Sequence, residues 1–227
     1  ETLRDSLSTS GMNETVSYAV SSLKALEITN SIPHNSEPVK LANPMDATKA
    51  WLRTSLVGNL LETLERNLRL NNQRALRLFE IGHVFSFPVG ATGDSLPVET
   101  EEIVGLAVGP RSEDSIWTSS SDQIDFYDLK GMLDFALASI RLEVKYQKFD
   151  HPTYRSGHVA KLILGDKLIG EIGGLDDKVS DHFKLPRQAI FLFRLNLTEM
   201  TQLVSSDVPT FQPLSRYPSS SRDLALL

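Results

Sequence analysis

The apolar residues of this chain recur at helical spacing in several segments. The clearest segment is residues 54–68, where the leucines that share one face of a helix are Leu56, Leu60, Leu61, Leu64 and Leu68. This spacing predicts an amphipathic helix, with Thr54 or Ser55 as its N-cap. A second helix is predicted to open at Asp125 or Asp128. Shorter helices are predicted at residues 2–11, 23–27, 176–183 and 198–204.

Between these segments, apolar and polar residues alternate and predict strands. The longest is residues 75–87, and the others are residues 16–20, 103–108, 142–149, 158–164, 168–175 and 189–197. Residues 88–101 are rich in Gly, Pro and acidic side chains, so we expect a loop that joins strands 75–87 and 103–108 into a hairpin. The pattern predicts an α+β fold, with an antiparallel β-sheet flanked by helices.

Composition narrows the possible functions. The 227 residues suffice for one large domain or two small ones. A formal net charge of −6 argues against binding nucleic acid across the whole surface, but it permits a local basic patch. The absence of cysteine excludes disulfides and thiolate metal sites. No apolar run reaches the roughly 18–20 residues that span a bilayer, and the N-terminal residues do not resemble a signal peptide. We therefore expect a cytoplasmic protein with no membrane partner.

The two ends of the chain suggest a longer polypeptide. The sequence begins at Glu1 in a helical pattern and stops within RDLALL, residues 222–227, which reads as a strand. Because domains rarely end inside a strand, we expect a piece of a larger protein.

One glycine-rich segment and the histidines are the obvious places to look for chemistry. The segment Gly170-Glu171-Ile172-Gly173-Gly174 lacks the spacing of a dinucleotide site and alternates like a strand, so we interpret it as a strand end with a tight turn. No two histidines lie three or four residues apart, so the sequence predicts no helical metal pair.

A hydrolytic site is the second chemical hypothesis. His151 and His158 flank Arg155 and Ser156, and the upstream acids Asp125 and Asp128 complete a possible set. No serine lies in a nucleophile elbow and no motif fixes a carboxylate pair. We therefore favour polar residues of loops and strand edges, and keep the hydrolase as an alternative.

Glu80 is a carboxylate on a strand face whose other members are apolar or small. It either faces a cleft or is buried beside a cation, for which Arg53 is the candidate. We favour the ion pair with Arg53, because a buried charge needs a partner.

Six short motifs occur in the order found in one known family. They are Asn43-Pro44-Met45, Leu52-Arg53-Thr54-Ser55-Leu56, Leu78-Phe79-Glu80-Ile81-Gly82, Asp128-Leu129-Lys130-Gly131, Leu168-Ile169-Gly170-Glu171-Ile172-Gly173 and Ser215-Arg216-Tyr217-Pro218. In this respect the chain resembles class II aminoacyl-tRNA synthetases, and in detail the beta chain of bacterial phenylalanyl-tRNA synthetase.

The departures from the class II pattern concern ATP. Catalytic class II domains use one arginine from a strand-loop-strand hairpin and another at the start of the last helix to hold phosphates. Here Ser86 and Pro88 stand at the first place, and residues 196–200 offer no arginine at the second. Residues 190–193 are bulky where active relatives keep glycines. The resemblance thus implies a catalytic fold without ATP chemistry, with no catalytic, cofactor-binding or metal-binding residue.

The resemblance also implies a domain plan and partners. Residues 1–210 would form the non-catalytic core, and residues 211–227 would begin a ferredoxin-like anticodon-binding domain. There, Arg216 and Arg222 would either contact RNA or be structural. The core would pack on the alpha catalytic chain of an enzyme with two alpha and two beta chains, which charges phenylalanine tRNA with ATP and magnesium. The alternative is a regulatory or interaction module on a degenerate synthetase fold.

Overall fold

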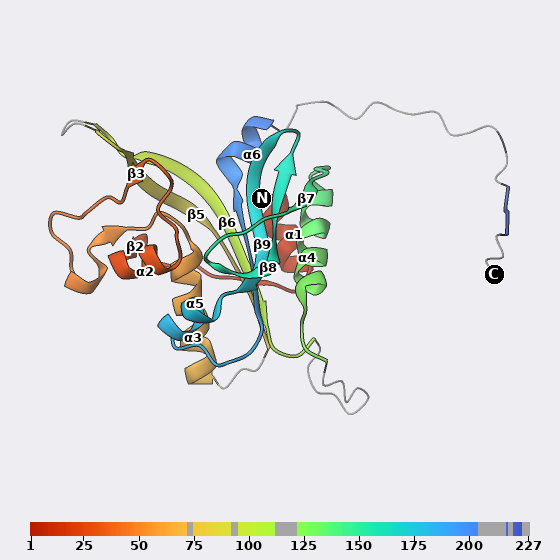
Figure 1. Cartoon of the computed structure of the whole chain (residues 1–227), viewed down its shortest axis with the longest axis horizontal. Coiled ribbons are helices and arrows are strands. Elements are labelled where there is room, and N and C mark those ends of the chain that lie inside the picture. The colour runs from red at the N-terminus through yellow and green to blue at the C-terminus, as the bar shows by residue number, and fades with distance from the viewer. Residues whose placement is uncertain (72–74, 92–94, 112–121, 204–216, 218–219, 224–227) are drawn as a thin grey trace.

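The structure, a computed structural model, describes residues 1–71, 75–91, 95–111, 122–203, 217 and 220–223. A twisted sheet forms its centre, and helices cover both faces (Figure 1). The strands that follow one another across the sheet are β1, β5, β6, β10, β9, β8 and β7, and β3 pairs with β5. This confirms the α+β fold and the flanking helices.

The predicted hairpin is present and is longer than expected. It consists of β5 (Leu76–Pro88) and β6 (Val98–Val108), which pair antiparallel. The prediction that residues 88–101 form a loop is wrong for residues 98–101, which lie in β6, and for Pro88, the last residue of β5. The ladder begins at the pair Ser86 and Val98, so the acidic residues before Ile103 belong to the strand. β10 (Ile190–Asn196) lies between β6 and β9 and is antiparallel to both.

The other half of the sheet is made by β9 (Lys167–Leu175), β8 (Tyr154–Leu164) and β7 (Lys145–Lys148). Residues 170–174 form the last part of β9, which ends at Leu175, so the predicted strand end is confirmed and the tight turn within this segment is wrong. A Cβ on Gly170 would lie 2.2 Å from the backbone oxygen of Arg194 on the neighbouring strand. The glycine is therefore needed for the close approach of β9 and β10.

The opposite edge of the sheet is irregular. β1 (Asn13–Glu14) pairs with β5 in parallel, so the sheet is not purely antiparallel, and β3 (Ser36–Glu37) pairs with the far end of β5. β2 (Val20–Ser21) and β4 (Trp51–Leu52) form a separate two-stranded sheet. The predicted strand 16–20 is therefore wrong except at Val20. Residues 15–19 form no strand ladder, and the side chain of Ser17 binds Glu80.

One face of the sheet, which we call the α3 face, carries α3 (Val57–Asn71), α2 (Leu23–Ile28) and α5 (Asp177–His182). The short helix η1 (Ala47–Lys49) precedes β4. The predicted leucine face of α3 packs on the sheet, with Leu56, Leu60, Leu61 and Leu64 fully buried and Leu68 partly buried. These leucines therefore stabilise the domain itself and are not available to a partner.

The other face, the α4 face, carries α1 (Thr2–Thr9), α4 (Phe126–Ser139) and α6 (Leu197–Leu203). The predicted N-cap of α4 is confirmed. Asp125 accepts hydrogen bonds from the backbone of Tyr127 and Asp128, and Asp128 accepts one from the backbone of Asp125, which makes a capping box. Among the described residues, no helix has the length and apolar character to cross a membrane.

Candidate functional site

Glu80 forms a buried ion pair on the α3 face. Nη1 of Arg53 donates to Oε1 of Glu80 at 2.7 Å, and the hydroxyl and amide of Ser17 also bind this carboxylate. Glu80 is 2% exposed and Arg53 is 6% exposed. The arginine is held further by its Nε, which donates to the backbone oxygen of His83 at 2.9 Å. The predicted ion pair is confirmed, and Glu80 does not face an open cleft.

A second carboxylate, Glu102 of β6, caps the start of α3. Its Oε2 accepts hydrogen bonds from the amide of Leu56 at 2.6 Å and from the hydroxyl of Ser55 at 2.8 Å. Ser55 Oγ in turn accepts from the amide of Val57, so Ser55 is the cap that the sequence predicted and Thr54 is not. Burial raises the pKa of Glu102, and the helix amide and Arg194 oppose this effect.

Arg194 of β10 lies between two carboxylates. Its Nε is 3.4 Å from Oε1 of Glu102 and 3.5 Å from Oε1 of Glu171 on β9. The hydroxyl of Tyr154 on β8 lies 3.4 Å from the same oxygen of Glu171. We call Glu102, Glu171, Arg194 and Tyr154 the polar cluster. It links four neighbouring strands, β6, β10, β9 and β8, to the start of α3.

The electrostatics of the polar cluster favour internal pairing. Burial works against the charge on Arg194, but Glu171 and Glu102 raise its pKa. Burial and the nearby Glu171 carboxylate raise the pKa of Tyr154 well above its usual value. Tyr154 thus stays a neutral hydroxyl, and the arginine charge is offset by the carboxylates beside it.

Sequence reasoning missed the polar cluster, although its members carry a recognisable signal. Glu171 and Arg194 are each the lone charged residue of a predicted strand, 168–175 and 189–197, and Glu80 is the lone charged residue on its face of residues 75–87. The rule that led to Glu80 would have selected both, since a charge on a buried strand face needs a partner.

The phenylalanines of β10 lie on the other side of the sheet. Phe191 and Phe193 pack in the core of the α4 face, and Phe193 is fully buried. A Cβ on Gly105 of β6 would lie 2.4 Å from the ring of Phe193. The bulk expected at residues 190–193 is therefore divided between the two faces, since Ile190 and Leu192 lie in the core of the α3 face. The two rings pack on the α4 face, and Arg194 of the polar cluster lies on the same side of β10 as Ile190 and Leu192.

The chain offers little to a phosphate group at the two places where class II catalysis uses arginine. The sequence has no Lys or Arg from Val84 to Glu102, nor from Leu195 to Ser215. Ser86 lies in β5 opposite Val98. Arg53 and Arg194, the described cations on this part of the α3 face, are each bound to carboxylates. These ion pairs connect neighbouring strands, and the two arginine charges are neutralised within the fold.

The residues of the hydrolase hypothesis do not form one site. Asp125 and Asp128 cap α4 and bind Arg111. Ser156 donates to Asp150 at 3.1 Å, which is not the arrangement of a serine activated by histidine.

The remaining members of that hypothesis are equally separate. Arg155 pairs with Asp177, and His158 is exposed on β8. Burial lowers the pKa of His151. The described residues contain no group of three or more His, Asp and Glu side chains suited to a metal ion.

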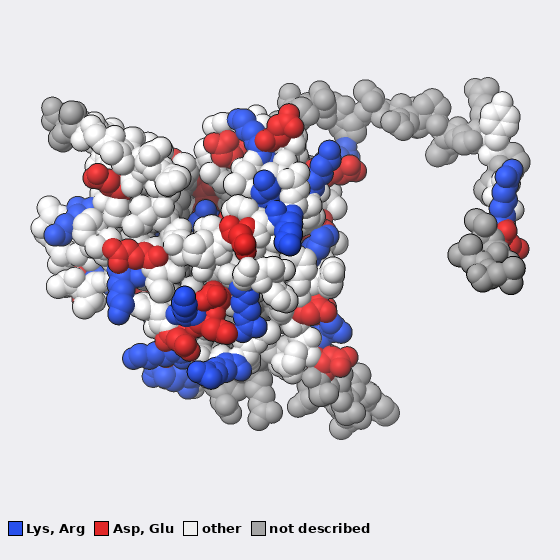
Figure 2. All heavy atoms as spheres, viewed as in Figure 1, with Lys and Arg blue, Asp and Glu red and all other residues white. Residues whose placement is uncertain are grey.

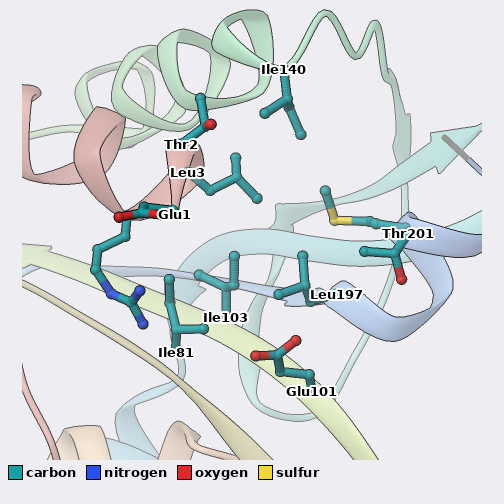
Figure 3. Close-up of a pocket in the computed structure, with 11 residues that line it drawn as sticks. Glu1, Thr2, Leu3, Ile81, Glu101, Ile103, Ile140, Leu197 and Thr201 are labelled. Atoms are coloured by element: carbon teal, nitrogen blue, oxygen red, sulfur yellow. The ribbon is translucent and has the colours of Figure 1, made fainter. Parts of the chain in front are cut away.

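A hollow of about 540 Å³ lies on the α4 face between α1, α6 and the sheet (Figure 3). Its apolar lining is Leu3, Ile81, Ile103, Ile140, Leu197 and Met200. Arg4, the basic residue among those that line it, binds Glu14 at 2.8 Å. The hollow therefore presents apolar surface and carries no catalytic arrangement of side chains.

Curated relatives cover nearly the whole chain. The phenylalanine–tRNA ligase beta subunit of Fusobacterium nucleatum is 30% identical over 95% of this chain and 26% of its own length. The beta subunits of Syntrophus aciditrophicus and Legionella pneumophila are 31% and 32% identical, over 100% and 97% of this chain and 28% and 26% of their own lengths. The chain thus spans about a quarter of the length of these relatives.

A solved structure supports the fold. The pyrrolysyl tRNA synthetase PylSc of Desulfitobacterium hafniense aligns with a TM-score of 0.61 at 15% identity, over 88% of this chain and 66% of that one. The family model described as the phenylalanyl tRNA synthetase beta chain CLM domain matches residues 1–197. With this match over most of the chain, and with the sheet and helices of a synthetase, the chain belongs to the family of phenylalanyl tRNA synthetase beta chain CLM domains.

Proposed function

We propose that this chain is the non-catalytic core of the beta subunit of a phenylalanine–tRNA ligase. In this proposal it packs on an alpha catalytic chain, and two alpha and two beta chains form the cytoplasmic enzyme. The alpha chains attach phenylalanine to its tRNA with ATP and magnesium. The family match and the beta-subunit relatives support this role.

One observation carries the non-catalytic part of the proposal. Arg194 is held between Glu102 and Glu171 at 3.4 and 3.5 Å, on the same face of the sheet as the Arg53–Glu80 pair. A nucleotide site needs cations whose charge is available to phosphate. Here two carboxylates flank Arg194, so a phosphate would have to compete with both of them.

The domain boundary belongs to the same proposal. The family match ends at residue 197, and the described fold ends with α6. We assign residues 211–227 to the start of an anticodon-binding domain. Most of these residues, including Arg216 and the greater part of the strand predicted at 222–227, lie outside the described part of the chain.

The alpha-chain contact is assigned to the irregular edge of the sheet. Val16 and Tyr18 are 92% and 88% exposed. The residue between them, Ser17, is anchored to Glu80, and the backbone oxygen of Tyr18 accepts a hydrogen bond from Asn59 at 3.0 Å. Two apolar side chains are thus held in solvent by an anchored backbone, as expected of a protein interface.

Co-expression with an alpha chain from the same organism tests this function. A tag on the alpha chain should co-purify this chain in equal amount, and a double Val16→Asp, Tyr18→Asp variant should be lost from the complex. Met45→Asp is the matched control, because Met45 is fully exposed elsewhere. Circular dichroism should show that all variants are folded. If the wild-type chain does not co-purify, the subunit role is wrong.

A further inference from the structure

Basic side chains gather on the outer surface of α3 beside α5. A hollow of about 500 Å³ lies there, and its charged and imidazole lining is Glu62, Glu65, Arg66, Arg69, His182 and Lys184. Figure 2 shows several Lys and Arg side chains at this end of the molecule, near the end of α3, with Asp and Glu side chains beside them. This concentration is unexpected in a chain whose net charge is −6.

The two acidic residues of the hollow are already engaged. Glu65 accepts from Nε of Arg69 at 2.9 Å, and Glu62 pairs with Lys49. Arg66 and Lys184 are exposed and form no ion pair within the described part of the chain. Lys24 is exposed on α2, which packs against α5, so this third cation lies near the same surface. Burial lowers the pKa of His182, and the ammonium of Lys24 adds to this effect. We call Lys24, Arg66 and Lys184 the basic surface.

The basic surface is built on ordered backbone. Phe183, which precedes Lys184, is 7% exposed and packs in the core of the α3 face. Lys184 has a positive φ of 54° at the end of α5. Arg66 lies on the exposed side of α3, opposite its buried leucines. The three charges thus come from three helices or their ends that share one core, so little backbone ordering accompanies binding.

The lining of the hollow indicates which groups it recognises. Its apolar side chain, Phe183, is buried, so this ring offers no face on which a nucleobase could stack, and the half-buried imidazole of His182 is the other ring in the lining. The remaining attraction is electrostatic and suits a repeating anion. Phosphate contacts of this kind position a nucleic acid without reading its sequence.

We infer that the basic surface binds the phosphodiester backbone of RNA. This inference rests on the proposed function. A subunit of a tRNA ligase meets tRNA, and tRNA is a polyanion that could contact the basic surface. It adds a contact region to the core itself, separate from the anticodon-binding domain and from the edge assigned to the alpha chain.

The test compares two triple variants for binding to unfractionated bacterial tRNA. One removes the basic surface, with Lys24→Gln, Arg66→Gln and Lys184→Gln. The matched control removes the same charge from β7 and β8, with Lys145→Gln, Lys148→Gln and Lys161→Gln. Fluorescence anisotropy at several salt concentrations gives the dissociation constant and its salt dependence, and co-purification with the alpha chain is measured in parallel.

We expect the first variant to bind tRNA at least tenfold more weakly at low salt. The slope of log affinity against log salt should fall by about 2, since each phosphate contact contributes about 0.7. The control should keep most of its affinity. An equal loss in both variants would overturn the inference. If the first variant loses tRNA but still binds the alpha chain, the basic surface is separate from assembly. If wild type binds tRNA at this surface but never binds the alpha chain, the subunit role fails and the RNA contact stands.

Discussion

Arg53 and Glu80 join the connection before α3 to the middle of β5 through a buried ion pair with an Nη1–Oε1 distance of 2.7 Å. Ser17 binds the same carboxylate and also accepts from Arg53 Nη1 at 2.9 Å. The three residues therefore hold the segment that carries Val16 and Tyr18 against the sheet. A Cβ on Gly82 would lie 2.5 Å from Arg53 Nη2, so the glycine leaves room for the guanidinium.

Removal of the Glu80 carboxylate should destabilise the fold. In Glu80→Ala, the guanidinium of Arg53 stays buried without its counter-charge, so we expect the free energy of unfolding to fall by about 3 kcal/mol. Glu80→Gln keeps an acceptor and should lose less. Urea denaturation of both variants measures the difference. Equal stability of Glu80→Ala and wild type would show that the pair contributes nothing.

The contact between Gly105 and Phe193 gives a second prediction. A methyl group at Gly105 would meet the ring of Phe193 at 2.4 Å, and this ring is fully buried. Gly105→Ala should therefore cost about 1–3 kcal/mol through overpacking. The matched control is Gly131→Ala on α4, where a Cβ has no neighbour within 4 Å. There, alanine should stabilise by up to about 1 kcal/mol. Thermal denaturation should move the two midpoints in opposite directions.

Glu102 should make the stability depend on pH in a defined direction. Burial raises its pKa in the folded chain, so the folded state holds the proton more tightly than the unfolded state. Its contribution is then complete below the pKa of an unfolded glutamate, about 4.3. It is lost as the pH rises through the higher folded value.

Glu102→Gln isolates this effect, since glutamine does not titrate. The free energy of unfolding of wild type, minus that of the variant, should be larger near about pH 4 than near about pH 7. Denaturation by urea at both values measures it. A difference that grows toward pH 7 would mean that the ion pair with Arg194 outweighs burial.

The sequence correctly predicted the helices and strands that bury one face, because their apolar residues recur at the spacing of a helix or a strand. The leucines of α3 and the alternation in β5 are of this kind, and the capping residues Ser55 and Asp125 marked where two helices begin. The strand predicted at residues 16–20 was wrong because Val16 and Tyr18 alternate with polar residues, as in a strand, but are exposed to solvent. The early start of β6 was hidden because its acidic residues read as a loop.

The polar cluster could not be assembled from the sequence alone. Glu102, Glu171 and Arg194 lie far apart along the chain, and they meet only because β10 lies between β6 and β9. Local patterns do not specify that strand order. The partner of Glu80 was easier to predict, because Arg53 lies in a neighbouring motif. The structure confirms this ion pair.

Pyrophosphate exchange with phenylalanine and ATP tests most directly whether this core lacks nucleotide chemistry. The purified chain alone should give no exchange above the blank, because Arg53 and Arg194 are bound to Glu80, Glu102 and Glu171. Exchange should arise once the alpha chain is added. Exchange by the chain alone, abolished by Arg194→Gln, would contradict the account.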